Sequence, residues 1–457
     1  MNSNTSRRAF LQRASALSLA GSAVPWALSL AAMGEAAAAT ASDYKALVCV
    51  FLYGGNDYGN TLIPYDNTRY AAYQAMRPNL AYSQAALAAT VLTPSVALPG
   101  GIQYAIAPEL SPLLPIFQAG RMGVLLNVGT LLQPTTKAQY TANAVPLPPK
   151  LFSHNDQQSV WQSSNPEGAT SGWGGRMGDL FESGNGAATF TCVNVSGNAV
   201  FLSGRQAVQY QVSASGPVAL SASKNLFGSS ACATELQRLI TAPSTNLFEN
   251  EYTKVMARSL SAGSQLVTAL AGGTTLSTVF PAGNSLADQL RLVARMISTS
   301  NELGAKRQVF FVSLGGFDNH DGLATIHPGL LSTLADALGA FYAATVELGV
   351  AAQVTSFTAS DFGRTLAGNN DGSDHGWGSM HFMLGGAVKG QRLYGTPPAI
   401  ANNGPDDVGQ GRLLPSTSVD QYAATLGKWF GISDADLLTV LPKLVNWNSS
   451  QRNLGFV

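Results

Sequence analysis

Residues 47–57 of the chain read LVCVFLYGGND. The first six form a continuous apolar run, which is typical of a strand buried on both faces of a parallel sheet. A Gly-rich turn then carries Asp57 just beyond the end of that strand. Similar apolar runs recur at residues 123–126, 309–314 and 354–357, and we expect each of them to be a strand.

Apolar residues at helical spacing lie between these runs. They occur over 286–297, where Asn284 or Ser285 could cap a helix, over 331–341 and over 418–430. Strands that alternate with helices predict an α/β fold, with a doubly wound, mostly parallel sheet flanked by helices. The stretch from about 190 to 280 is rich in Ser, Ala, Gly and Thr, and we expect it to be an inserted subdomain.

The N-terminus has the pattern of an export signal. Arg7 and Arg8 precede an apolar pair, an uncharged stretch rich in Ala, Leu and Ser follows, and a small-residue run ends at Ala41. This order is that of a twin-arginine signal peptide, so we expect residues 1–41 to direct export and to be removed. The mature protein would then be periplasmic or secreted, with no transmembrane helix. An uncleaved anchor is the alternative, because the apolar stretch approaches the length of a spanning helix.

Composition excludes several classes of protein. The 457 residues include 26 Lys+Arg and 26 Asp+Glu, and no basic stripe occurs, which argues against nucleic acid as a partner. The phosphate-loop, dinucleotide-loop, GxSxG and HExxH motifs are missing from the sequence. Three cysteines without a CxxC spacing argue against a zinc–thiolate site. One disulfide between Cys192 and Cys232 stays open, whereas Cys49 is expected to be a core residue.

Aspartates and histidines gather after the later strands. Residues 315–322 read GGFDNHDG directly after one apolar run, residues 358–365 read TASDFGRT after another, and residues 372–378 read GSDHGWG. Ligands of open α/β sheets bind outside the carboxyl ends of the strands, so we expect the aspartates that follow three of the strands to meet there. The alternative for any single aspartate is a helix cap or a turn.

Carboxylates that lie close together repel each other, and a bound cation removes the repulsion. With imidazoles added, the donors form a mixed oxygen and nitrogen set, which suits Zn²⁺ or Mn²⁺ better than Ca²⁺ or Mg²⁺. Arg364 could hold an anionic substrate through its planar fork. The predicted metal ligands are Asp57, Asp318, His320, Asp361, Asp374, His375 and His381.

Seven short motifs stand out along the mature chain. They are FLYGGND at 51–57, FSHNDQ at 152–157, GFDNH at 316–320, SDFGRT at 360–365, DHG at 374–376, SVDQY at 418–422 and WFG at 429–431. Together they resemble a family of twin-arginine-exported bacterial proteins of unknown function in the alkaline phosphatase and sulfatase superfamily. The resemblance implies that residues 42–457 form one alkaline phosphatase-like domain.

The resemblance also implies roles for individual residues. Asp57 would be the first-strand ligand, Asp318 and His320 a second pair, and Asp361 and His375 further ligands. Nucleophiles of the superfamily begin a helix after the second core strand, and Ser153 is the hydroxyl that best fits this place. A helix N-cap is the alternative for that serine. No Cys-x-Pro-x-Arg motif occurs, which excludes a formylglycine sulfatase.

These observations predict an exported metal-dependent hydrolase of phosphate or sulfate esters, acting on a small anionic ester. Metal ions would polarise the substrate oxygen and Arg364 would stabilise the developing charge. The alternative is a non-catalytic envelope protein that keeps the fold for binding or assembly. Phe362 favours this alternative, because the superfamily carries a histidine directly after the corresponding aspartate.

Overall fold

The apolar run at residues 47–52 lies at the centre of the sheet, in strand β1 (Lys45–Leu52). β1 pairs in parallel with β7 (Arg307–Leu314) on one side and with β8 (Val354–Ser360) on the other. These strands belong to a computed structural model that describes residues 41, 43–218 and 224–457. Apart from Ala41, the predicted signal peptide lies outside the described residues.

The sheet has the strand order β12-β4-β11-β8-β1-β7-β5-β6, with β13 beside β4. Among the described strands of this sheet, only β11 runs antiparallel to its neighbours. The predicted mostly parallel sheet is therefore confirmed, and all four predicted strands are present. The other strands of this sheet are β4 (Met122–Gly129), β5 (Cys192–Asn194), β6 (Tyr210–Gln211), β11 (Ser379–Gly385), β12 (Arg392–Tyr394) and β13 (Thr417–Ser418).

Two small antiparallel pairs lie outside the main sheet. β2 (Leu62–Pro64) pairs with β3 (Tyr104–Ile106), and β9 (Arg364–Gly368) pairs with β10 (Ser373–His375). The second pair matters for the site, because it folds the third polar string back beside the second. His375 lies opposite Arg364 in this pair.

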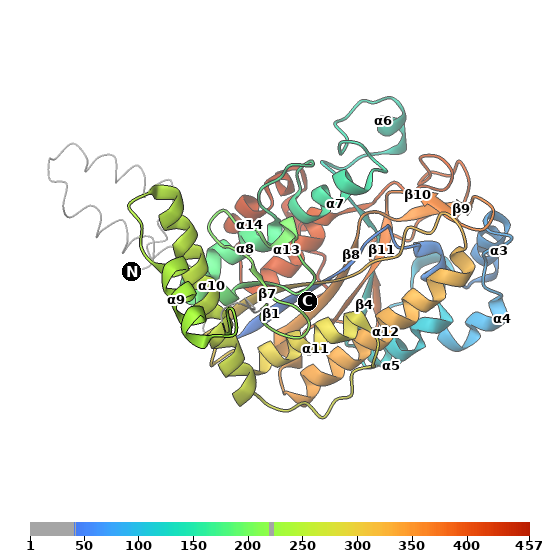
Figure 1. Ribbon diagram of the computed structural model, residues 1–457. Coiled ribbons are helices and arrows are strands. Elements are labelled where there is room, and N and C mark those ends of the chain that lie inside the picture. The colour runs from blue at the N-terminus through green and yellow to red at the C-terminus, as the bar shows by residue number, and fades with distance from the viewer. Residues whose placement is uncertain (1–40, 42, 219–223) are drawn as a thin grey trace, which may run out of the picture. The chain divides into compact units, whose positions relative to one another are not determined.

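Helices cover both faces of the sheet (Figure 1), as a doubly wound fold requires. α11 (Ser285–Ser298) and α12 (Leu323–Glu347) lie on one face, and α8 (Trp173–Phe181) and α13 (Val419–Phe430) lie on the other. The remaining helices are α3 (Asn67–Met76), α4 (Gln84–Leu87), α5 (Leu114–Gln118), α6 (Lys137–Thr141), α7 (His154–Ser163), α9 (Ser230–Thr241), α10 (Leu247–Gly272) and α14 (Asp434–Val440).

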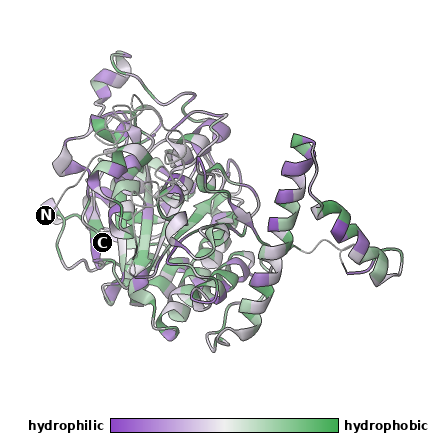
Figure 2. Ribbon diagram, turned by 90° about the vertical axis from the view of Figure 1, so that its left-hand side faces the viewer, coloured by the Kyte–Doolittle hydropathy of each residue, from purple (hydrophilic) through white to green (hydrophobic). Residues whose placement is uncertain are grey.

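Side chains alternate between two cores along β1. Val48 and Val50 point into the core beneath α11 and α12, whereas Phe51 stacks on Phe311 in the other core, with ring centroids 5.8 Å apart. Figure 2 shows hydrophobic residues concentrated on the strands and hydrophilic residues on the outer surfaces of helices. Each fully buried side chain of this size contributes about 1.5–3 kcal/mol. Burial on both faces explains why the strands read as continuous apolar runs.

Local capping fixes the helices that the sequence predicts. The Asn284 side chain accepts a hydrogen bond from the Ala287 amide at the start of α11, as expected. Ser418 and Gln421 form a capping box at the start of α13. α12 begins earlier than predicted and includes Pro328 within its second turn, where the proline removes one i→i−4 hydrogen bond of the helix.

α12 is long and apolar enough to cross a membrane by length and composition alone, and it is the one such helix in the described part of the chain. Many of its apolar residues, among them Leu331, Leu334, Leu338 and Phe341, are buried in the core. Packing against the sheet layer therefore accounts for its apolar character.

The stretch at 190–280 is divided between two environments. Its first part supplies β5 and β6 to the main sheet, and its later part forms α9 and α10, which pack against each other.

The disulfide left open by the sequence is not formed, since Cys192 and Cys232 are both free. Cys192 is buried beneath α8, where a Cβ at Gly178 would lie 2.5 Å from its Sγ, whereas Cys232 is exposed on α9. Cys49 is a buried core residue, as predicted.

Candidate metal centre

The carboxyl ends of β1, β7 and β8 are neighbours, and the loops that follow them are in contact. Gly54 and Gly55 have φ angles of 113° and 82°, in the left-handed region that favours glycine. A Cβ at Gly54 would lie 2.4 Å from the backbone nitrogen of Asp318. The Gly54 amide also donates to Asp361 Oδ1 at 3.2 Å. The two glycines therefore let the first loop pass between the aspartates that follow the other two strands.

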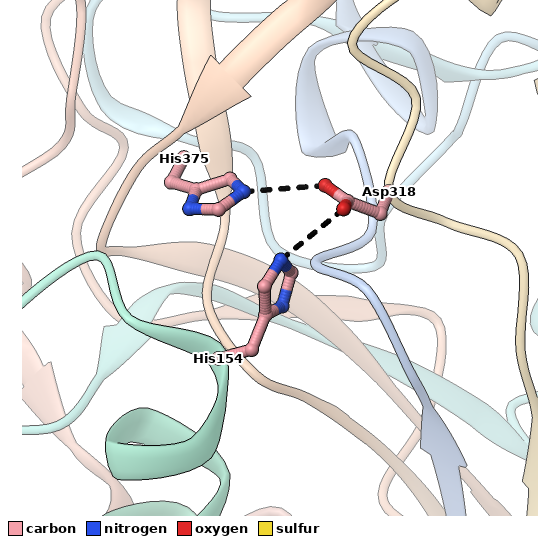
Figure 3. A group of neighbouring side chains, drawn as sticks. All are labelled: His154, Asp318 and His375. Carbon is pink, nitrogen blue, oxygen red and sulfur yellow. Dashed lines mark hydrogen bonds and ion pairs between the residues drawn. The ribbon is translucent and has the colours of Figure 1, made fainter.

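Three histidines point one ring nitrogen at Asp318. Nε2 of His154 lies 3.3 Å from Asp318 Oδ2, and Nε2 of His320 and of His375 lie 3.1 and 3.2 Å from Oδ1. Figure 3 shows two of these contacts, with His154 at the start of α7 and Asp318 in the loop after β7. The Asp318 side chain is 45% exposed, so solvent reaches this cluster.

The other ring nitrogen of each histidine is held by an acceptor. Nδ1 of His154 lies 2.7 Å from Asp361 Oδ2, Nδ1 of His320 lies 3.3 Å from Asp374 Oδ1, and Nδ1 of His375 lies 2.6 Å from the Phe152 carbonyl oxygen. A carbonyl oxygen only accepts, so Nδ1 of His375 carries a proton. In a neutral ring the lone pair then sits on Nε2, which faces Asp318. Outer partners of this kind are what orient metal-ligating histidines.

The donor atoms fit a divalent cation. His154, Asp318 and His375 each offer one ligand atom, and these atoms lie within 4.8 Å of one another. Ligand atoms of one ion lie about 2.0–2.6 Å from it, and therefore no more than about 5 Å apart. Nε2 of His154 is buried without a hydrogen-bond partner, and Nε2 of His320 lies 2.9 Å from Nε2 of His375. A cation bound between the Nε2 atoms of His154, His320 and His375 would give each of these three nitrogens a partner.

Charge also favours a cation here. Asp318, Asp361 and Asp374 touch the histidines, and Arg364 is the cation in direct contact with Asp318, at 2.5 Å. Burial alone would raise the pKa of Asp318, but Arg364 and the histidines hold that pKa below its ordinary value. The hydrogen bond to Asp361 raises the pKa of His154, whereas burial lowers the pKa of His375.

Asp57 does not face this cluster. Its carboxylate is fully buried and binds Arg77 through both oxygens, at 2.8 and 2.9 Å. It also accepts hydrogen bonds from the Asn60 amide and from Ser373 Oγ. Burial would raise the pKa of Asp57, but the Arg77 guanidinium holds it below its ordinary value. The geometry therefore favours a structural ion pair over the predicted metal ligand.

His381 lies in the core and contacts no other predicted ligand in the described chain. Its ring packs edge-on against Trp161 and is stacked on Tyr422, and its Nδ1 lies 3.1 Å from Thr358 Oγ1. Burial lowers the pKa of His381 to about 3, so the ring is neutral at physiological pH. Because β11 alternates its side chains between the two faces of the sheet, this histidine faces the core instead of the strand ends.

Both predicted catalytic residues are already held by hydrogen bonds to other residues of the protein. Arg364 is fully buried and donates to Asp318, to the Gly54 carbonyl and to the Ser373 carbonyl and hydroxyl, which leaves it no free edge for a substrate. The Ser153 hydroxyl donates to Asp156 Oδ2 at 2.9 Å. Ser153 stands at the N-cap of α7, next to His154.

The cluster thus includes Asp318, His320, Asp361, Asp374 and His375 from the predicted set and adds His154. The sequence contains a signal for that histidine, because it stands inside the FSHNDQ motif. It was missed because it comes from a helix distant in sequence from the later polar strings. Phe362, the residue after Asp361, packs its ring against those of His154 and His375, with centroids 4.9 and 4.7 Å apart.

Fold and site together define an α/β protein with a cluster of histidines and aspartates, the candidate metal centre, at the carboxyl edge of its sheet. The chain belongs to the family described as "Protein of unknown function (DUF1501)", whose profile matches residues 44–441. No curated protein matches it significantly.

Solved structures similar to this chain include sulfatases and a phosphatase. The PsFucS1 sulfatase from Pseudoalteromonas sp. has 11% identity and a TM-score of 0.36, with 91% of this chain and 72% of that chain covered. Ps i-CgsB in complex with k-i-k-neocarrahexaose has 9% identity and a TM-score of 0.36, with 89% and 77% covered. Alkaline phosphatase from the Antarctic bacterium TAB5 has 10% identity and a TM-score of 0.31, with 88% and 99% covered. These likenesses are too remote to carry an argument about activity.

Proposed function

We propose that this protein is an exported, metal-dependent hydrolase of phosphate or sulfate esters. The observation that carries the proposal is the convergence of three imidazole Nε2 atoms on Asp318, each with its Nδ1 held by an acceptor. Nitrogen donors favour Zn²⁺ or Mn²⁺ over Ca²⁺ or Mg²⁺. The resemblance of the short motifs to the alkaline phosphatase and sulfatase superfamily supports an ester with an anionic group as the substrate.

The chain's own residues have distinct roles in this proposal. His154, Asp318, His320 and His375 would hold the metal, which when bound would polarise a substrate oxygen as a Lewis acid. Asp361, Asp374 and the Phe152 carbonyl fix the ring orientations, and such outer partners typically affect metal affinity 10- to 100-fold. Arg364 keeps Asp318 ionised and oriented.

A non-catalytic binding protein of the cell envelope is the second candidate. The observation that favours it is the hydrogen bond from Ser153 to Asp156, which turns the best-placed hydroxyl toward a carboxylate outside the cluster. Metal content alone does not separate a binding protein from an enzyme, so hydrolysis has to be measured as well.

We expect protein purified without chelator to contain Zn²⁺ or Mn²⁺ by elemental analysis and to hydrolyse an aryl phosphate or an aryl sulfate. Ser153→Ala should keep the metal; if Ser153 is the nucleophile, this variant loses turnover, and if not, it keeps it. Metal-free wild-type protein that remains inactive with Zn²⁺, Mn²⁺, Mg²⁺ and Ca²⁺ added would favour the binding protein.

Export by the twin-arginine route remains part of the proposal. Replacing Arg7 and Arg8 by lysines should leave precursor in the cytoplasm, because the paired arginines mark this route. Fractionation of expressing cells measures the effect, with Arg13→Lys as the matched control because it changes a nearby arginine outside the pair. An unchanged periplasmic yield of the double variant would contradict the prediction.

A further inference from the structure

We propose that Arg412 binds the anionic group of the ester at the candidate metal centre. The inference rests on the proposed function and concerns a residue that the sequence motifs do not mark. Arg412 borders the cluster directly, because its Nε donates to the His375 carbonyl at 2.8 Å. Its guanidinium also lies 4.9 Å from the centre of the Phe152 ring.

The guanidinium is held in place while its outer edge stays unengaged. Nη1 has a single long contact, 3.4 Å to the Gly409 carbonyl, and Nη2 has no partner among the described residues. Arg412 forms no ion pair with a carboxylate in the part of the chain that the structure describes. A half-buried arginine with two free N–H directions can bind two oxygens of one phosphate or sulfate group.

The loop that carries Arg412 is itself firmly held. Asp407 Oδ1 accepts hydrogen bonds from the amides of Gly409 and Gly411, at 2.6 and 2.8 Å. The Gly411 carbonyl in turn accepts from the Leu366 amide and from the Tyr58 hydroxyl. A side chain positioned in advance loses less conformational entropy when it binds a ligand.

The other cations around the site do not fit this role as well. Arg364 and Arg77 are buried and fully engaged. Lys150 is 70% exposed, lies 3.6 Å from Asp156 and presents a point charge on a flexible stem. Among the described residues near the cluster, Arg412 therefore best combines a fixed position with a free edge.

An anionic ester needs a positively charged side chain such as Arg412 to bind at the candidate metal centre. Asp318, Asp361 and Asp374 repel an approaching phosphate or sulfate, and a divalent metal together with Arg364 would only balance their three charges, which leaves no positive charge over for the anion. In this proposal the metal and the Arg412 guanidinium bind the same anionic group.

The test measures metal content and the binding of inorganic phosphate and sulfate separately, by elemental analysis and by calorimetry on the metal-loaded protein. Arg412→Met should keep the metal and weaken anion binding about 10- to 100-fold, the range for a lost hydrogen bond to a charged group. Arg412→Lys should fall between, because it keeps the charge but loses the fork. Arg291→Met, on α11, is the matched control and should bind like wild type.

The outcomes separate this inference from the proposed function. Wild-type metal content and wild-type anion affinity in Arg412→Met would overturn the inference alone. Loss of metal together with loss of anion binding in that variant would also overturn it, since Arg412 would then only position His375. Wild-type protein that takes up no metal and binds neither anion would overturn the proposed function and the inference together. A preference for phosphate or for sulfate in the wild type identifies the ester class.

Discussion

Substitution of Asp318 by alanine is expected to abolish metal binding and, with it, any ester hydrolysis. Asp318 is the residue that all three histidine Nε2 atoms face, so its loss removes a ligand and part of the negative charge that attracts the cation. Changes to outer partners of metal ligands already cost 10- to 100-fold in affinity, and we expect a loss of more than about 100-fold here. Equilibrium dialysis with Zn²⁺ measures it.

Two variants make this result specific. Asp318→Asn keeps the size of the side chain and should also lose the metal, which separates ligand loss from a packing defect. Asp321→Ala removes an exposed carboxylate three residues away and should bind metal like wild type. Wild-type metal content in Asp318→Ala would contradict the assignment of the site, whatever happened to activity.

The second large effect concerns stability. We expect Asp57→Ala or Arg77→Met to cost about 3–5 kcal/mol in the free energy of unfolding, because each leaves an unpaired charge in the interior. Both side chains are essentially inaccessible to solvent. Urea unfolding followed by circular dichroism measures the loss. The matched control is Lys428→Met, which breaks the exposed pair with Asp434 and should cost less than about 1 kcal/mol.

The same variants decide between the two roles of Asp57. If Asp57 pairs only with Arg77, the double variant Asp57→Ala/Arg77→Met should regain part of the stability that each single variant loses. If Asp57 is a metal ligand, Asp57→Ala should instead lose metal while the fold stays intact. Retained stability with lost metal would therefore contradict the structural ion pair.

Acidification should destabilise the protein through the Asp57–Arg77 ion pair. The pKa of Asp57 is lower in the folded protein than in an unfolded chain, so the unfolded state binds its proton first as the pH falls. The contribution of ionised Asp57 to the free energy of unfolding is complete above the ordinary carboxyl pKa. It is lost as the pH drops through the lowered pKa of Asp57 in the folded protein. Asp57→Asn should accordingly show a shallower loss of stability on acidification than wild type does.

Much of the fold follows from local patterns. The run at 47–52 and its counterparts at 309–314 and 354–357 carry no charged residue, and only Ser313, Thr355 and Ser356 interrupt their apolar character, because each strand is covered by helices on both faces. This pattern identifies a parallel α/β sheet without any knowledge of strand order. The antiparallel strand β11 and the short strands β5 and β6 were not predicted, because their pairing depends on segments distant in sequence.

The candidate site was likewise predictable from the sequence only in part. The sequence by itself determined that Asp318 and Asp361 follow buried strands, and strand ends of a parallel sheet share one edge, so their proximity could be predicted. The partners of Asp57, Arg364 and His154 were decided only by the tertiary structure. A carboxylate after a strand is equally suited to a cation or to an arginine. Which one it meets depends on what a distant segment brings within about 3 Å, and here α3 brings Arg77 to Asp57 while α7 brings His154 to Asp318.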